Sequence, residues 1–193
     1  MTIRKINLLD DDELRNQIDA LYEIQPQITI AKWSLEIAKR SICICNICEN
    51  SFPEVAEGFR INEMWQAGKA RMHEVWQAGF AIHKVARAQT DELLTVTFRV
   101  IGQAVASGHM KEHGMVASDY AIKLINLMYP CDMSKVIEER QWQLSKLDEL
   151  SQWQISVIRS VDVLIFLRYT PSKRSVLLWV KKSITLSMIW QRY

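Results

Sequence analysis

Glycine and proline are scarce in this chain, with six and four residues among 193. Because these residues build most tight turns, we expect few turns and long elements between them. Alanine, leucine, glutamate, lysine, arginine and glutamine fill the stretches between turns, and all of these residues favour helix. The alternation of β-branched and polar residues that is typical of strands is nearly absent before Ser151. The sequence predicts an all-α, single-domain antiparallel array of about seven helices.

Long apolar runs are also missing. The longest, residues 163–167 and 176–180, stop after five residues, whereas a membrane-spanning helix needs about 18. The N-terminus reaches the acidic residues 10–13 without the apolar core of a signal peptide. Four cysteines, three of them between residues 43 and 48, do not make a disulfide framework in a chain of this size. We therefore expect a cytoplasmic protein with no transmembrane segment.

Acidic residues are almost absent from the C-terminal part of the chain. Residues 159–193 contain seven lysines and arginines and the single acid Asp162, so the first 158 residues carry 17 basic and 21 acidic residues, a net charge of −4. We predict a helical domain over residues 1–150 and a basic, apolar extension over 151–193, to which the sequence pattern assigns no structure. Because the cations of the extension are scattered, no nucleic-acid partner is expected.

Capping residues and turn residues divide residues 1–150 into helices. The first three predicted helices run from the acidic residues 10–13 to Gln25, from Pro26 to about Cys48, and from a cap at Asn50–Ser51 to Gly68. The fourth begins at Met72, and the fifth runs from a cap at Thr90 or Asp91 to Gly108. The sixth runs from the end of a His109–His113 connection to Tyr129, and the seventh begins at a cap at Asp132 or Ser134.

The fourth predicted helix carries a stripe of apolar residues at helical spacing. The stripe contains Met72, Val75, Trp76, Gly79, Ile82, His83 and Ala86. We predict that this helix packs by its Trp76 side and that His83 is a hydrogen-bonded core histidine.

The fifth predicted helix is apolar nearly all round and should be central in the array. Its polar residues Thr95, Arg99, Gln103 and Ser107 follow one another at intervals of four, which places them along one edge. A buried arginine needs a partner. Arg99 and Gln103 therefore either hold a neighbouring helix or face a groove that binds a ligand, and both alternatives stay open. The sixth helix is expected to turn Asp119 outward.

Two groups of residues have the types found in metal sites. The segment His109–His113 matches H-x-x-E-H, a zinc-protease signature that requires a helix and a third ligand. Gly108 and Gly114 flank it as they would a turn, so we predict no metal and no cofactor, with His109, His113 and His83 as the alternative set of ligands. Cys43, Cys45 and Cys48, with Cys131, lack the paired spacing of a strong zinc motif, and we interpret them as small apolar residues.

One block of the sequence resembles a known family. The segment from Arg99 to His113, R-V-I-G-Q-A-V-A-S-G-H-M-K-E-H, is followed by Tyr120-Ala121. It resembles the most characteristic block of the immunity-five-like group of bacterial immunity proteins. The resemblance extends over residues 27–150 and includes E-G-F-R at 57–60, Trp65, Gly68 and I-H-K-V-A-R at 82–87.

This resemblance implies a helical, cytoplasmic, non-enzymatic antitoxin that neutralises a cognate polymorphic toxin by stoichiometric binding. It also implies a toxin gene immediately upstream. The residues that we expect to form a central polar patch, or to bind the partner, are Arg99, Gln103, His109, His113, His83 and Arg87. A net charge of −4 favours a basic toxin. The alternatives are a zinc-dependent hydrolase built on the H-x-x-E-H segment and a helical scaffold without a toxin.

Overall fold

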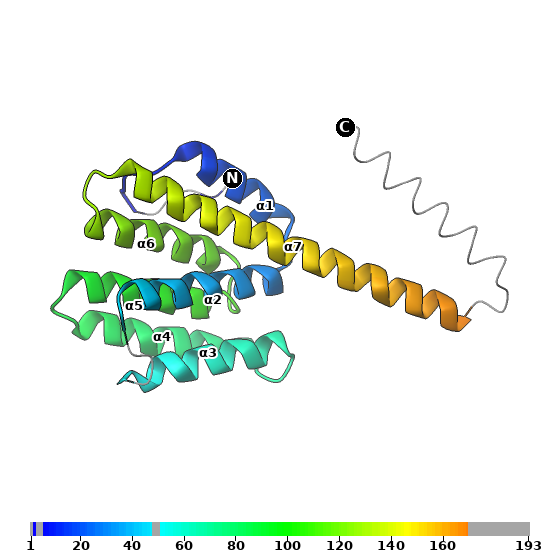
Figure 1. The fold of residues 1–193 in the computed structure, drawn as a ribbon. Coiled ribbons are helices and arrows are strands. Elements are labelled where there is room, and N and C mark those ends of the chain that lie inside the picture. Colours follow the sequence, from blue (N-terminus) through cyan, green and yellow to red (C-terminus); the bar gives the residue numbers. More distant parts are fainter. Residues whose placement is uncertain (1, 3–5, 48–50, 170–193) are drawn as a thin grey trace. The chain divides into compact units, whose positions relative to one another are not determined.

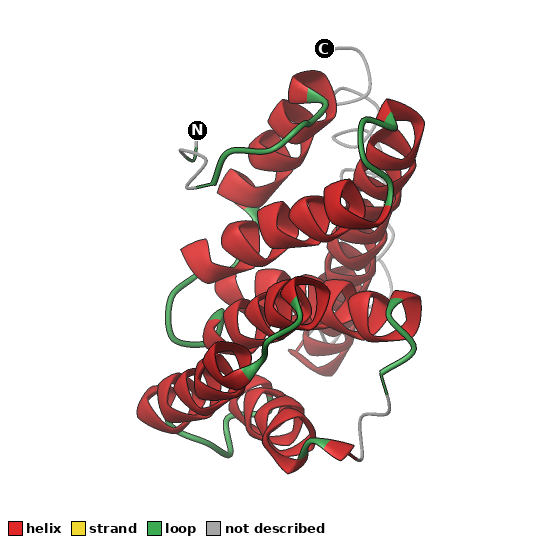
Figure 2. Ribbon diagram, turned by 90° about the vertical axis from the view of Figure 1, so that its left-hand side faces the viewer, coloured by secondary structure: helices red, strands yellow, loops and turns green. Residues whose placement is uncertain are grey.

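The computed structural model describes residue 2, residues 6–47 and residues 51–169, with side chains as far as residue 152. Seven helices and no strand occur in these residues, which confirms the all-α prediction (Figures 1 and 2). They are α1 (Asp12–Ile24), α2 (Gln27–Ile44), α3 (Pro53–Gln66), α4 (Met72–Ala88), α5 (Glu92–Ala106), α6 (Glu112–Met128) and α7 (Met133–Tyr169).

The contacts within the chain define two compact units, Met1–Ser151 and Gln152–Tyr193. The first contains α1 to α6 and the start of α7. Helix α7 continues as far as Tyr169, so residues 151–169, which the sequence pattern left unassigned, are helical. The reason is that no glycine or proline interrupts the chain between Pro130 and Pro171. Residues 170–193 of the predicted extension lie outside the described residues.

Helix α5 is the central helix of the first unit, as its apolar circumference predicts. It contacts α2, α3, α4 and α6, and its residues Phe98, Val100, Ile101 and Ala104 are fully buried. Helices α4, α5 and α6 follow one another side by side, and α2 packs against α5 and α6 (Figure 1). No helix in the described part of the chain is long and apolar enough to cross a membrane.

Local signals in the sequence account for several helix ends. The carboxylates of Asp11 and Asp91 accept hydrogen bonds from the backbone N–H groups of Leu14, at 2.9 Å, and Leu94, at 2.8 Å, at the starts of α1 and α5. Gly68 ends α3 in a left-handed conformation, with φ +70°. The N–H of Lys69 donates to the Met64 carbonyl at 2.8 Å, the hydrogen bond of a Schellman motif.

Two predicted boundaries are wrong. Helix α2 ends at Ile44 instead of near Cys48, because Asn46 takes a left-handed conformation with φ 51° and the N–H of Ile47 turns back to the Ile42 carbonyl. Helix α3 begins after Phe52, whose side chain makes no capping hydrogen bond. Ser51 is therefore not the cap, and Asn50 lies outside the described residues.

Asp119 is buried, which contradicts the prediction that it points outward. Only 3% of its surface is exposed, and its Oδ1 accepts hydrogen bonds from Arg15 Nε and Arg140 Nη2, both at 2.9 Å. Arg140 is fully buried and also donates to Asp10 Oδ2 at 2.6 Å. The side of α6 that carries Asp119 is therefore covered by α1, α7 and the segment before α1.

Candidate functional site

The predicted polar residues come together where α4, α5 and α6 meet. Arg99 and Gln103 lie on α5, His83 and Arg87 on α4, His113 in the first turn of α6, and His109 in the turn between α5 and α6. We call these six residues the central polar cluster.

Hydrogen bonds inside the cluster join the three helices. His113 Nδ1 donates to Gln103 Oε1 at 2.6 Å, which places the ring proton on Nδ1 because an amide oxygen only accepts. Arg99 Nη1 lies 3.5 Å from His83 Nδ1, which is its acceptor. The rings of His109 and His113 are 6.1 Å apart between centroids. Arg99 and Gln103 therefore contact α4 and α6 directly.

Glycines allow α4 and α5 to approach closely enough for these contacts. A Cβ atom at Gly102 would lie 2.7 Å from His83 Cε1, and one at Gly79 would lie 3.1 Å from the Gly102 carbonyl oxygen. Both distances are shorter than ordinary contacts, so a side chain at either position would push the helices apart. The His83 ring thus rests on the backbone of α5 at the residue before Gln103.

The pKa of His83 is lowered to about 4 by burial and then by the positive charges of Arg99, His113 and Arg87. His83 is consequently neutral near pH 7. Because a guanidinium can only donate, the single ring proton lies on Nε2 and Nδ1 accepts from Arg99. A base for catalysis near neutrality needs a pKa close to 7. His83 is therefore suited to a structural contact and not to proton transfer.

The turn that carries His109 is attached to α2. Gln27 Nε2 donates to the carbonyl oxygens of Ser107 and Gly108, at 2.9 and 3.0 Å. The hydroxyls of Ser34 and Ser107 are 2.8 Å apart. Within the described part of the chain, His109 Nδ1 is buried without a hydrogen-bond partner. The start of the turn is thus held against α2, and the His109 ring lies beside that of His113.

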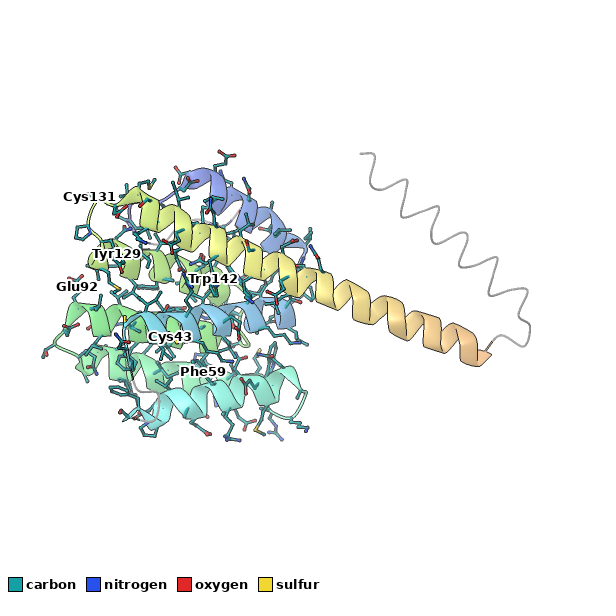
Figure 3. All side chains as sticks on the ribbon, viewed as in Figure 1. Cys43, Phe59, Glu92, Tyr129, Cys131 and Trp142 are labelled. Carbon is teal, nitrogen blue, oxygen red and sulfur yellow. The ribbon has the colours of Figure 1, made fainter. Side chains whose placement is uncertain are left out.

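The H-x-x-E-H segment does not lie on a single helix. His109 belongs to the turn, whereas Glu112 and His113 are the first two residues of α6, so the two histidines do not project from one helical face as the zinc signature requires. Cys43 and Cys131 are exposed at separate places (Figure 3), and Cys48 lies outside the described residues. In the part of the chain that the structure covers, no group of three or more His, Cys, Asp or Glu residues is arranged to hold a metal.

Helix α4 packs by part of the predicted stripe, but not by the edge that carries Trp76. Its buried residues are Val75, Gly79, Ile82 and Ala86, whereas 43% of Trp76 is exposed. Met72 and Phe80, at intervals of four from Trp76, are 53% and 45% exposed. The prediction for Trp76 is wrong because α4 packs mainly against α3 and α5, which cover only part of its apolar circumference.

Comparison with known proteins supports the predicted resemblance. A family model described as "Imm-5 like putative immunity protein" matches residues 20–150, a segment that runs from the end of α1 into α7 and includes the whole central polar cluster. No curated protein and no solved structure matches the chain. Because the match covers well over half of the sequence and agrees with the block from Arg99 to His113, the chain belongs to the Imm-5-like family of immunity proteins.

Proposed function

We propose that this protein is a cytoplasmic antitoxin that neutralises a cognate bacterial polymorphic toxin by binding it in a fixed ratio, without catalysis. The family match over residues 20–150 carries this proposal. The site geometry is consistent with it, because His83 is held neutral between Arg99 and His113 and the histidines of the H-x-x-E-H segment are divided between a turn and α6.

The central polar cluster would serve this function by fixing α4 and α6 on α5. The hydrogen bond between His113 and Gln103 and the contact between Arg99 and His83 each join two helices. Both arginines stay within reach of a partner, since Arg99 is half-buried and Arg87 is exposed. The cluster would therefore hold the binding surface in shape and supply two cations at its margin.

Co-expression with the toxin domain encoded by the upstream gene tests this function. We expect wild-type protein to restore growth, and the two purified proteins to form a complex of fixed stoichiometry in size-exclusion chromatography with light scattering. Titration of toxin activity should end at molar equivalence, because a binding antitoxin is consumed by its target. Inactivation of the toxin by a small fraction of an equivalent would show catalysis and refute the proposal. Failure of the wild type to protect the cells would refute the toxin-binding role.

Variants of the central polar cluster test whether these residues contribute to toxin neutralisation. Arg99→Ala, Gln103→Ala and the double variant of His109 and His113 should weaken protection, with the protein level checked by immunoblot. Undiminished protection by all three variants would leave the antitoxin function intact and remove the cluster from it.

A further inference from the structure

Helix α4 has a second apolar side that stays about half exposed. Met72, Trp76 and Phe80 are spaced by four residues and are 53%, 43% and 45% exposed. Residues four apart are neighbours on a helix surface, so the three side chains form one continuous row. Soluble proteins rarely expose adjoining large apolar side chains unless the surface binds a partner.

The side chains of this row are held in place by one another. The ring centroids of His73 and Trp76 are 5.4 Å apart with an interplanar angle of 22°, and those of Trp76 and Phe80 are 5.9 Å apart at 17°. Three stacked rings on a helix lose little conformational freedom when a partner covers them. Tryptophan is also among the residues that contribute most to binding energy at protein interfaces.

Two cations border the row. Lys84 Nζ lies 5.2 Å from the Phe80 ring centroid, and Arg87 Cζ lies 5.4 Å from it. The only acid of α4 is Glu74, whose carboxylate accepts a hydrogen bond from the Arg71 backbone N–H at 2.7 Å. This side of α4 is therefore positive, although residues 1–158 together carry a net charge of −4. We call Met72, His73, Trp76, Phe80, Lys84 and Arg87 the α4 strip.

We propose that the α4 strip is the surface that docks the toxin, and that it receives an acidic segment of the toxin carrying an exposed apolar side chain. This inference rests on the proposed antitoxin function and adds the docking surface and the charge of its counterpart. Charge complementarity indicates which kind of segment binds the strip, because an acidic segment pairs with Lys84 and Arg87 while its apolar side chain covers Trp76 and Phe80.

A nucleic acid is the other macromolecule that binds aromatic rings next to cations. Its affinity depends on several phosphate contacts, whereas among the described residues the cations that contact a ring of the strip are Lys84 and Arg87. The net charge of −4 on residues 1–158 also opposes a polyanion. These charges favour a protein segment with a few carboxylates.

Binding of the toxin domain encoded by the upstream gene to purified variants tests the strip. Replacing Trp76 and Phe80 together by alanine should weaken binding about 30-fold or more, as removal of central interface aromatics does. Lys84→Glu and Arg87→Glu should each slow association several-fold, and more at low salt than at high salt.

The chain offers a matched control. Tyr129 is 40% exposed (labelled in Figure 3), and Lys135 Nζ lies 5.9 Å from its ring centroid. This pair reproduces the chemistry of Phe80 and Lys84 at the end of α6. Tyr129→Ala and Lys135→Glu should bind the toxin domain within about threefold of wild type, the scale expected outside the energetic centre of an interface.

The binding and neutralisation results distinguish a failure of the proposed docking surface from a failure of the proposed antitoxin function. If wild type neutralises the toxin and the Trp76/Phe80 double variant does so equally well, the strip is refuted and the antitoxin function stands. If wild type does not bind the toxin domain, the function fails and the strip fails with it.

Two further measurements test the docking surface without relying on a variant that could misfold, and test whether the strip binds nucleic acid. Hydrogen exchange of the wild-type amides in α4 should slow in the complex, and unchanged exchange there would overturn the docking surface without any variant. A fluorescent single-stranded oligouridine should show no binding. Binding of this probe that is lost in the Trp76/Phe80 variant would replace the protein segment by nucleic acid and overturn the proposal.

Discussion

Replacing His83 by glutamine should remove a pH-dependent part of the stability of the fold. His83 is half-buried, and its Nδ1 accepts from Arg99. Burial, followed by the charges of Arg99, His113 and Arg87, lowers its pKa from 6.5 to about 4. A glutamine side chain offers an amide oxygen to Arg99 and does not titrate.

The direction of the effect follows from proton binding. Between about pH 6.5 and about pH 4, the unfolded chain protonates His83 and the folded chain does not, so the free energy of unfolding falls as the pH falls. A pKa difference of one unit corresponds to about 1.4 kcal/mol, and the His83 shift gives a loss of about 2 kcal/mol between about pH 7 and about pH 5. Solvent near this partly exposed ring reduces the loss to about 1 kcal/mol.

Urea unfolding followed by tryptophan fluorescence measures this difference. The seven tryptophans of the chain provide the signal, and the wild type and His83→Gln share the other titrating groups, whose contributions cancel to first order in the comparison. The stability of the variant should fall less than that of the wild type between about pH 7 and about pH 5. Equal losses, or an NMR titration of the His83 ring near its ordinary pKa, would refute the reasoning.

Three further substitutions test the packing. Arg140→Met removes the guanidinium that pairs with the buried carboxylates of Asp10 and Asp119 and should cost about 3 kcal/mol or more in urea unfolding; a loss below about 1 kcal/mol would contradict the buried ion pairs. Gly79→Ala places a Cβ 3.0 Å from Ala106 Cβ and 3.1 Å from the Gly102 carbonyl oxygen. The resulting strain outweighs the helix propensity gained, so the melting temperature should fall, and a rise would contradict the close approach of α4 and α5. Gly68→Ala puts a side chain at φ +70° and should cost about 1 kcal/mol, with a smaller cost for Gly68→Asn; equal stability of all three proteins would count against the left-handed turn.

Helix ends were predictable where one residue determines them. Asp11 and Asp91 each cap a helix with their own carboxylate, and Gly68 adopts the conformation that glycine favours. The end of α2 depends on Asn46, a residue that takes the left-handed conformation less readily than glycine does, so its signal is weaker. The end of α7 stayed unassigned because residues 151–169 are rich in valine and isoleucine, which form helices less readily than alanine or leucine, although nothing between Pro130 and Pro171 breaks the helix.

The central polar cluster was partly predictable. The intervals of four on α5 place Arg99 and Gln103 on one edge, and the short turn after Gly108 returns the chain beside them. The sequence did not indicate which neighbour each would contact. His83 reaches Arg99 because Gly79 and Gly102 bring α4 close to α5, and this approach depends on two helices at once.

The errors at Asp119 and Trp76 have one physical cause. Both predictions assumed that the apolar side of a helix faces inward and its polar side faces solvent. Helix α6 has neighbours on its polar side, so Asp119 is buried in ion pairs with Arg15 and Arg140. Helix α4 packs mainly against α3 and α5, so Trp76 is exposed. The periodicity of one helix reveals the width of its apolar surface, and the number of neighbours determines how much of it is covered.

This distinction is the reason for proposing the α4 strip as a binding surface. The apolar residues at 72, 75, 76, 79, 80, 82 and 86 span about 160° of the helix circumference, and the contacts with the other described helices bury the half that contains Val75, Ile82 and Ala86. Burial of this inner half accounts for most of the packing of α4, so Trp76 and Phe80, which are 43% and 45% exposed, contribute less to the stability of the fold than the core residues of α4 do. Their removal should therefore weaken toxin binding by far more than it lowers the free energy of unfolding, a combination that a core residue cannot produce.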